Sequence, residues 1–223
     1  MTTTPAANVP TRIQQNFLAR HERRLLNWIC PRLPAWVMPD QLTTLGFLGA
    51  MMVAAGYMLS WIDDEWLGLC LAGYIVNWFG DSLDGSLARW RRIERPNYGY
   101  FVDHSVDAVA TLLMVGAIGM SPYLRLDVAL MAVIGYFLLS IHTFIAAKVV
   151  GEFRLSYMAG GPTELRLMLM AMTVTMAFVG PGDIRGTNFS PFDLFGLVIA
   201  SILVTLFVVQ SFTTARMLRA RGG

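Results

Sequence analysis

The sequence has little charge and very few cysteines. Acidic and basic residues make up 14% of its 223 residues, whereas hydrophobic residues make up 55%. An average soluble domain carries about 25% charged residues, so this composition argues against a water-soluble fold. The two cysteines, Cys30 and Cys70, form neither a disulfide framework nor a metal-binding motif. Residues 1–10 lack the basic start and apolar core of a signal peptide, and we expect them to be disordered.

Long apolar runs recur along the chain. A helix of about 20 apolar residues crosses a hydrocarbon core of about 30 Å. We identify six such runs, at residues 41–61, 66–90, 98–120, 126–149, 165–179 and 192–212. The sequence therefore predicts an all-α, polytopic membrane protein, in which residues 34–223 form one domain with six transmembrane helices.

Residues 11–33, ahead of the first span, combine apolar and basic side chains. Ile13, Phe17 and Trp28 alternate with arginines such as Arg20 and Arg24. This pattern predicts an amphipathic helix that lies in the membrane interface. The alternative is a short cytosolic helix packed on the protein, because amphipathicity alone does not separate the two.

The basic residues gather on one side of the predicted membrane domain. With six spans, all of them except Arg125 and Arg185 share a side with both termini. Cytoplasmic loops carry the excess of Lys and Arg, so we expect cytoplasmic termini and a rim that attracts anionic lipid headgroups. Sixteen arginines accompany a single lysine, which suggests a GC-rich bacterial genome and hence the inner membrane. Nothing in the charge pattern implies a nucleic-acid partner.

Four aspartates stand in the second and third spans, close to the loop that joins them. Asp81 and Asp84 are three residues apart, and Asp103 and Asp107 are four apart. On helices, each pair projects from one face. The two spans are antiparallel, so the pairs meet at similar depth near the cytoplasmic side. Acidic side chains within membrane spans indicate a functional site.

Carboxylates placed so close together require protons or cations between them. Two negative charges repel by about 4 kcal/mol at about 4 Å, even with an effective dielectric constant of about 20. Oxygen ligands select hard ions such as Mg²⁺ or Mn²⁺, and a pair of such ions suits displacement at phosphorus. The residue types indicate this metal set, but any of the four aspartates could be the general base.

Small and polar residues surround the aspartates. Gly85 and Gly99 remove side chains beside them, Ala88 extends the small surface, and Arg89 adds a cation suited to a diphosphate. Asn77, one turn before the first aspartate, should face the same cavity. Each also has a structural interpretation: small residues pack helices together, Arg89 marks the cytoplasmic side, and Asn77 forms an interhelical hydrogen bond.

These residues resemble the signature of the class I CDP-alcohol phosphatidyltransferases, DxxDGxxAR followed by eight residues and GxxxDxxxD. All eight signature residue types are present, as Asp81, Asp84, Gly85, Ala88, Arg89, Gly99, Asp103 and Asp107. The chain departs from the pattern in one respect, because nine residues separate Arg89 from Gly99. The family's PNxxT at the start of the first span is represented by residues 39–43, Pro-Asp-Gln-Leu-Thr, where Asp40 can serve as a helix N-cap.

The resemblance implies transfer of a phosphatidyl group from CDP-diacylglycerol to a polar alcohol, with release of CMP, in phospholipid biosynthesis. It implies two Mg²⁺ or Mn²⁺ ions held by Asp81, Asp84 and Asp103. Asp107 would be the general base and also contact a metal. Gly85, Ala88 and Arg89 would form part of the CDP site, with Asn77 added by its position. The resemblance also implies a homodimer.

Two alternatives stay open. CDP-choline or CDP-ethanolamine could instead donate its headgroup to diacylglycerol, because the signature recognises only the shared CDP-phosphate. A cation-coupled or proton-coupled transporter is a different class, but the sequence shows no internal repeat of the kind that transporters have. Among the remaining polar residues, we expect His104 to point away from the aspartates and Thr163 to cap the fifth span. Arg166 should lie at the cytoplasmic mouth.

Overall fold

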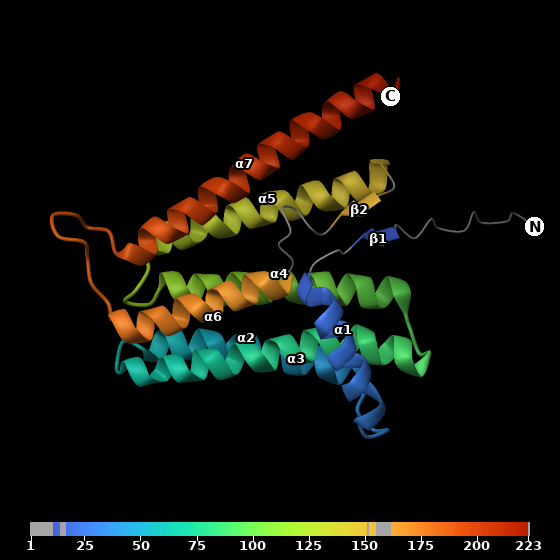
Figure 1. Ribbon diagram of the computed structural model, residues 1–223, viewed down its shortest axis with the longest axis horizontal. Coiled ribbons are helices and arrows are strands. Elements are labelled where there is room, and N and C mark those ends of the chain that lie inside the picture. The colour runs from blue at the N-terminus through green and yellow to red at the C-terminus, as the bar shows by residue number, and fades with distance from the viewer. Residues whose placement is uncertain (1–10, 14–16, 151, 155–161, 223) are drawn as a thin grey trace, which may run out of the picture.

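Helices form nearly all the secondary structure of the protein (Figure 1). The structure is a computed structural model that describes residues 11–13, 17–150, 152–154 and 162–222. The helices are α1 (Phe17–Ile29), α2 (Pro39–Leu59), α3 (Leu67–Arg91), α4 (Pro96–Gly119), α5 (Leu126–Val150), α6 (Pro162–Val179) and α7 (Pro191–Ala220). The 3₁₀ turn η1 (Cys30–Arg32) directly follows α1, and the 3₁₀ turn η2 (Asp64–Trp66) directly precedes α3.

The all-α class predicted from the sequence is confirmed, and two strands of three residues accompany the helices. β1 (Thr11–Ile13) pairs in parallel with β2 (Glu152–Arg154), and Thr11 lies opposite Glu152. The prediction of one helix over residues 11–33 is therefore wrong at its start. Thr11 and Ile13 are β-branched residues, which favour extended backbone where a partner strand is present. The predicted disorder of residues 1–10 lies outside the described residues.

Helices lie at all six predicted spans, as α2 to α7. By length and composition, α2, α4, α5 and α7 are able to cross a membrane. Among the described residues, α3 and α6 fall short of this test. The second half of α3 carries two aspartates and two arginines, and α6 has only 18 residues, with Glu164 and Arg166 in its first turns. The prediction of six spans is thus confirmed for four helices.

Close contact between α2 and α3 depends on glycines. A β-carbon on Gly73 would lie 2.7 Å from the backbone nitrogen of Val53, and one on Gly80 would overlap the backbone of Gly46. Small residues of this kind let helices approach closely in membranes. The packing holds α3 against α2 along its length, and so it sets the depth of the aspartates near the end of α3.

A buried polar cluster attaches α6 to this helix pair. The Tyr57 hydroxyl of α2 lies 2.5 Å from Thr173 Oγ1 of α6 and 3.4 Å from the Tyr74 hydroxyl of α3. All three side chains are fully buried. On the other side of α4, α5 packs against both α4 and α7 (Figure 1).

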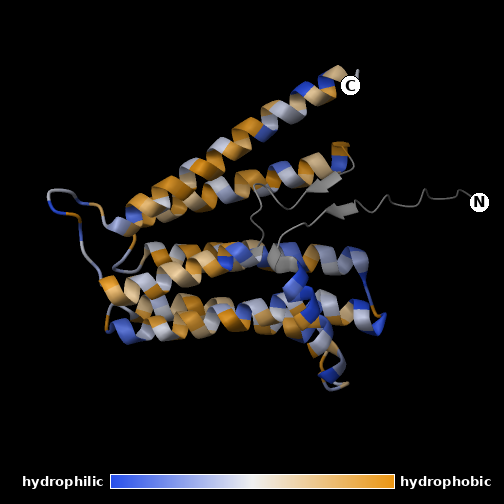
Figure 2. Ribbon diagram, in the orientation of Figure 1, coloured by the Kyte–Doolittle hydropathy of each residue, from blue (hydrophilic) through white to orange (hydrophobic). Residues whose placement is uncertain are grey.

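Hydrophobic side chains cover much of the outer surface of the long helices. Figure 2 shows polar residues concentrated on α1 and at the ends of the helices, with hydrophobic residues along their middle parts. Phe178 and Phe212 are 87% and 66% exposed, respectively. Large apolar side chains in such positions are suited to a lipid environment. Together with the apolar helices, they indicate an integral membrane protein.

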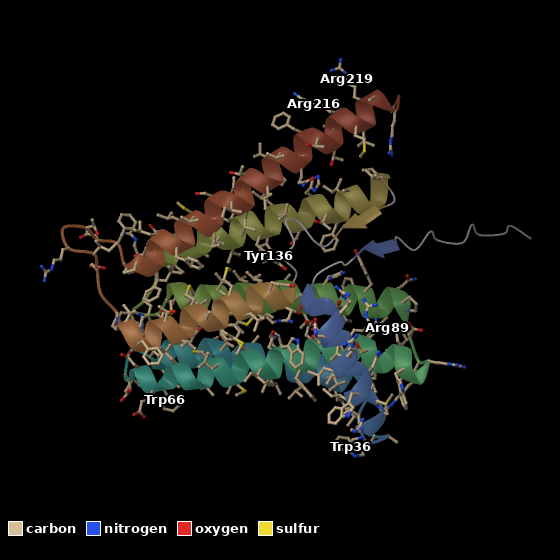
Figure 3. The ribbon with its side chains drawn as sticks, viewed as in Figure 1. Trp36, Trp66, Arg89, Tyr136, Arg216 and Arg219 are labelled. Atoms are coloured by element: carbon tan, nitrogen blue, oxygen red, sulfur yellow. The ribbon has the colours of Figure 1, made fainter. Side chains whose placement is uncertain are left out.

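The turn between α3 and α4 lies at one end of the helix bundle. α3 ends at Arg91, Arg92 adopts the left-handed conformation with φ of 57°, and α4 begins at Pro96. The Arg91 guanidinium donates hydrogen bonds to backbone carbonyls between α1 and α2, including that of Pro34 at 2.8 Å. Figure 3 shows Arg89, Arg216 and Arg219 toward this same end, with Trp66 toward the other. These three arginines therefore lie toward one end of the bundle, as the predicted topology requires.

Candidate active site

The four aspartates line one cavity. α3 contributes Asp81 and Asp84, and α4 contributes Asp103 and Asp107. All four belong to the walls of a cavity of about 1980 Å³. Their spacing of three and four residues turns each pair toward the same side of its helix. The structure thus brings together the carboxylates that the sequence singles out.

The other predicted site residues line the same cavity. They are Asn77, Gly85, Ala88 and Arg89 on α3 and Gly99 on α4. A β-carbon on Gly99 would meet nothing within 4 Å, so helix packing does not require a glycine there. A β-carbon on Gly85 would lie 3.3 Å from Arg89 Nη1 and would crowd the guanidinium. Both glycines therefore leave space beside the carboxylates.

Asn77 connects the cavity wall to α2. Its Nδ2 donates a hydrogen bond to the Gly46 carbonyl at 2.9 Å. Its Oδ1 is buried and has no hydrogen-bond partner among the described residues. The two interpretations of Asn77 from the sequence are therefore compatible, because the residue both forms an interhelical hydrogen bond and lines the cavity.

Asp84 receives a hydrogen bond from α2. Thr43 Oγ1 donates to Asp84 Oδ2 at 2.6 Å, and Asp84 is buried. Hydrogen bonds to ionised carboxylates are short and strong, and they hold the carboxylate in one orientation. Thr43 is the last residue of the Pro-Asp-Gln-Leu-Thr segment, so this contact gives the segment a role at the site.

Asp40, in the same segment, does not cap α2. The helix begins at Pro39, and its N-cap is Met38, whose backbone N–H donates to Gln41 Oε1 at 2.9 Å. The prediction of an Asp40 cap is wrong because proline favours the first helical position, which moves Asp40 into the first turn. Asp40 instead forms an ion pair with Arg95 in the turn before α4. This ion pair links the start of α2 to the segment between Arg89 and Gly99, which is one residue longer than in the family signature.

Asp81 forms an ion pair with Arg166 of α6. Arg166 Nη2 lies 2.6 Å from Asp81 Oδ2, and the Arg166 side chain is only 11% exposed. Asp107 and Glu22 also act electrostatically on Arg166. The sequence predicts Arg166 at the cytoplasmic mouth but does not indicate its contact with Asp81. A charged residue one turn inside an apolar span was the available signal.

Asp103 and Asp107 meet beside His104. One ligand atom from each of these three residues lies within 4.8 Å of the others, which is a spacing that could hold a metal ion. His104 Nδ1 lies 4.0 Å from Asp103 Oδ2, and its ring packs edge-on against Tyr100 at 4.3 Å between centroids. The expectation that His104 points away from the aspartates is therefore wrong. Its contact with Tyr100, one turn earlier, keeps it on the cavity wall.

Glu22 of α1 is a polar wall residue that sequence analysis did not single out. It accepts hydrogen bonds from Trp78 Nε1 and Ser82 Oγ at 2.8 Å and from Thr163 Oγ1 at 3.0 Å. The prediction that Thr163 caps α6 is wrong, because α6 already begins at Pro162. The Thr163 hydroxyl is directed to Glu22 instead.

The cavity also has an extensive apolar wall. It extends from the aspartates past Met114 of α4 and Leu169 of α6 to Phe195, Ile199 and Leu206 of α7. Carboxylates and arginines thus line one part of the cavity, and aliphatic and aromatic side chains line another.

Comparisons with known proteins agree with these features. A family model described as CDP-alcohol phosphatidyltransferase matches residues 36–216. Cholinephosphotransferase 1 of Danio rerio is 25% identical over 190 residues, which are 77% of this chain and 48% of that protein. Archaetidylinositol phosphate synthase of Pyrococcus horikoshii is 30% identical over 104 residues, which are 47% of this chain and 52% of that protein.

The matched regions thus make up about half the length of each of these two relatives. The family match includes every helix from α2 to α6 and the whole aspartate signature. The resemblance seen in the sequence is therefore confirmed, and the chain belongs to the CDP-alcohol phosphatidyltransferase family.

Proposed function

We propose that the protein transfers a phosphatidyl group from CDP-diacylglycerol to a polar alcohol and releases CMP, as a step of phospholipid biosynthesis. The lining of the cavity is the observation that supports this proposal. Its carboxylates and arginines suit a diphosphate and its counter-ions, and its apolar wall suits hydrocarbon chains. A CDP-linked lipid combines these two chemistries in one molecule. Family membership favours an enzyme over the transporter alternative.

The proposed cofactor is Mg²⁺ or Mn²⁺, as two ions held by Asp81, Asp84, Asp103 and Asp107. The donor set fits, because carboxylate oxygens are preferred ligands of such hard ions. The bound ions would neutralise charge on the diphosphate and polarise the phosphoryl group.

The chain's own residues would bind the diphosphate and remove a proton. Arg89 would bind diphosphate oxygens, and Gly85 and Ala88 would leave room for the nucleotide. Asp107 would accept the proton of the alcohol hydroxyl while the alcohol oxygen forms a bond to the phosphatidyl phosphorus. The bond from that phosphorus to the CMP oxygen breaks, and CMP leaves with the electron pair. The position of Asp107 in the cavity, beside Asp103 and His104, supports this role.

We further propose that α3 and α6 cross the membrane with the other four long helices. The aspartates of α3 face the cavity, so they need not contact lipid. Figure 1 shows α1 crossing α3 at a steep angle, as expected of a helix that lies in the membrane interface. Both termini and the site would then be cytoplasmic, in the inner membrane of a bacterium. The homodimer stays a prediction.

A second candidate is transfer of a phosphocholine or phosphoethanolamine group from its CDP derivative to diacylglycerol. The similarity to a cholinephosphotransferase over 77% of this chain favours it. The same aspartates and the same apolar wall would serve this reaction, with diacylglycerol as the acceptor.

One assay separates the candidates. Purified protein in lipid nanodiscs is given CDP-diacylglycerol with a panel of polar alcohols, or CDP-choline and CDP-ethanolamine with diacylglycerol, and CMP release is measured. The proposal predicts ion-dependent release from CDP-diacylglycerol that a chelator and Asp107→Asn abolish. Release from the second pairing alone would support the second candidate. Divalent-ion flux in liposomes without CMP release would contradict both and support a transporter.

A further inference from the structure

Glu22 connects α1 to both sides of the active site. Its Oε1 accepts hydrogen bonds from Trp78 Nε1 and Ser82 Oγ of α3, both at 2.8 Å. Its Oε2 accepts one from Thr163 Oγ1, in the first turn of α6, at 3.0 Å. A single carboxylate on α1 therefore holds two other helices at fixed positions.

These contacts surround the ion pair between Asp81 and Arg166. Ser82 is the residue after Asp81, and Thr163 lies three residues before Arg166, about one helical turn away. Arg166 is within 2.6 Å of Asp81, and the charge of Glu22 also acts on it. Glu22 thus contacts the neighbours of both partners, and its negative charge attracts the Arg166 guanidinium.

Glu22 is not needed merely to attach α1. Leu26 and Cys30 are buried in an apolar cluster with Leu83 and Leu87 of α3, and this cluster already holds α1 in place. A carboxylate placed among helices costs free energy unless hydrogen bonds and opposite charge offset the lost hydration. Glu22 has three hydrogen-bond donors and a guanidinium nearby. Its chemistry is therefore better explained by an electrostatic role at the site than by packing.

We infer that Glu22 is a positioning residue that fixes the first turn of α6 against α3 and thereby sets where Arg166 lies relative to Asp81. This inference rests on the proposed function, in which Asp81 binds a divalent ion. Arg166 and the ion would compete for the same carboxylate. The negative charge of Glu22 attracts Arg166 and so weakens this competition. Without that charge, Arg166 binds Asp81 more strongly and the site holds its ions less tightly.

The test compares three substitutions with a matched control. Glu22→Gln keeps the shape of the side chain but removes its charge, Glu22→Asp keeps the charge on a shorter side chain, and Thr163→Val removes one hydrogen-bond donor. The control is Arg24→Gln, since Arg24 is exposed on the same helix and lies outside the cavity wall. Mn²⁺ binding to protein in nanodiscs is followed by electron paramagnetic resonance without substrate. CMP release and thermal unfolding are measured in parallel.

We expect Glu22→Gln to raise the Mn²⁺ concentration for half-saturation about tenfold, as replacement of a residue that orients metal ligands commonly does. Glu22→Asp should lie between this variant and the wild type, and Arg24→Gln should match the wild type. Thr163→Val should shift binding in the same direction by about threefold. Glu22 and Thr163 act through one contact. The double variant of Glu22→Gln and Thr163→Val should therefore raise the Mn²⁺ concentration for half-saturation by less than the product of the two single effects.

Wild-type Mn²⁺ affinity in Glu22→Gln would overturn the inference, even if the melting temperature fell, because that result would show a structural role alone. A shift of similar size but opposite direction in Arg24→Gln would also overturn it, since the pair of shifts would reflect a general effect of charge on α1. A wild-type protein that neither binds Mn²⁺ nor releases CMP would instead contradict the proposed function. The wild-type measurement thus separates the two kinds of failure.

Discussion

Thr43→Val removes a single hydroxyl that α2 directs at the proposed metal site. Thr43 Oγ1 donates to Asp84 Oδ2 at 2.6 Å, and Asp84 is only 9% exposed. Valine has nearly the same shape as threonine, so the packing of α2 against α3 should persist. The substitution therefore tests the orientation of one carboxylate with little effect on the fold.

The expected size of the effect follows from that contact. A hydrogen bond to a charged group contributes about 1.5–3 kcal/mol, and its loss corresponds to roughly 10-fold to 100-fold in a binding equilibrium. A bound ion would restrain the Asp84 carboxylate in part, which favours the lower end of this range. We therefore expect the Mg²⁺ concentration for half-maximal CMP release to rise about tenfold.

Titration of CMP release with Mg²⁺ provides the assay, and the neighbouring threonine provides the control. Thr44 Oγ1 donates to the backbone carbonyl of Asp40 at 2.9 Å, within its own helix. Thr44→Val should therefore behave as the wild type, and Thr43→Ser, which keeps the hydroxyl, should remain close to it. An unchanged Mg²⁺ requirement in Thr43→Val, or an equal change in Thr44→Val, would show that α2 does not orient Asp84 through this hydrogen bond.

Three further predictions concern the fold. Gly80→Ala should destabilise the protein by about 1–3 kcal/mol, because the added β-carbon overlaps the backbone of α2. Gly116→Ala should leave the stability unchanged, because its β-carbon meets nothing within 4 Å. Equal melting temperatures of the two variants in detergent would contradict this prediction. Tyr57→Phe should lower the stability by about 1 kcal/mol, because it removes the buried hydrogen bonds of the hydroxyl. The Mg²⁺ concentration required for CMP release should not change. A changed Mg²⁺ requirement would contradict a purely structural role of Tyr57. Burial raises the pKa of the Cys30 thiol, so little reactive thiolate forms at neutral pH. Maleimide labelling of a Cys70→Ser variant should then be slow until detergent denaturation, and rapid labelling of the folded protein would show that Cys30 is accessible.

The meeting of the aspartates could be predicted because it depends on local geometry. Helical spacing alone turns Asp81 and Asp84, and likewise Asp103 and Asp107, toward one side of each helix. A short turn between two helices then makes them antiparallel and brings the pairs to similar depth. These steps need no knowledge of the rest of the fold.

Contacts between distant segments could not be predicted in this way. Arg166 is 85 residues from Asp81, and Glu22 is 141 residues from Thr163. Their meeting depends on which faces of α1 and α6 pack against α3, and periodicity does not encode that choice. In the sequence, the excess of arginine on the cytoplasmic side is enough to explain Arg166. Nothing there indicates its contact with Asp81. The ion pair of Asp40 could not be predicted either, because its partner Arg95 lies in another turn.

The number of membrane spans shows a related difficulty. α3 and α6 carry charges of the site and fall short of the length and composition of a membrane helix among the described residues, whereas α4 carries two of the aspartates and still meets them. Their burial against α2, through Gly80 and through the cluster of Tyr57 and Thr173, becomes evident only in the folded chain. Charged residues of the site therefore weaken the hydropathy signal of α3 and α6, but not that of α4.

The proposed function requires that the four aspartates form one metal-dependent site for CMP release. The most direct test measures CMP release from CDP-diacylglycerol by purified wild type and by Asp81→Asn, Asp84→Asn, Asp103→Asn and Asp107→Asn at saturating Mg²⁺ or Mn²⁺. The proposal predicts release by the wild type that a chelator abolishes, and a loss of about 100-fold or more in each variant that still folds. Release that persists in the chelator, or in a folded variant lacking one aspartate, would contradict it.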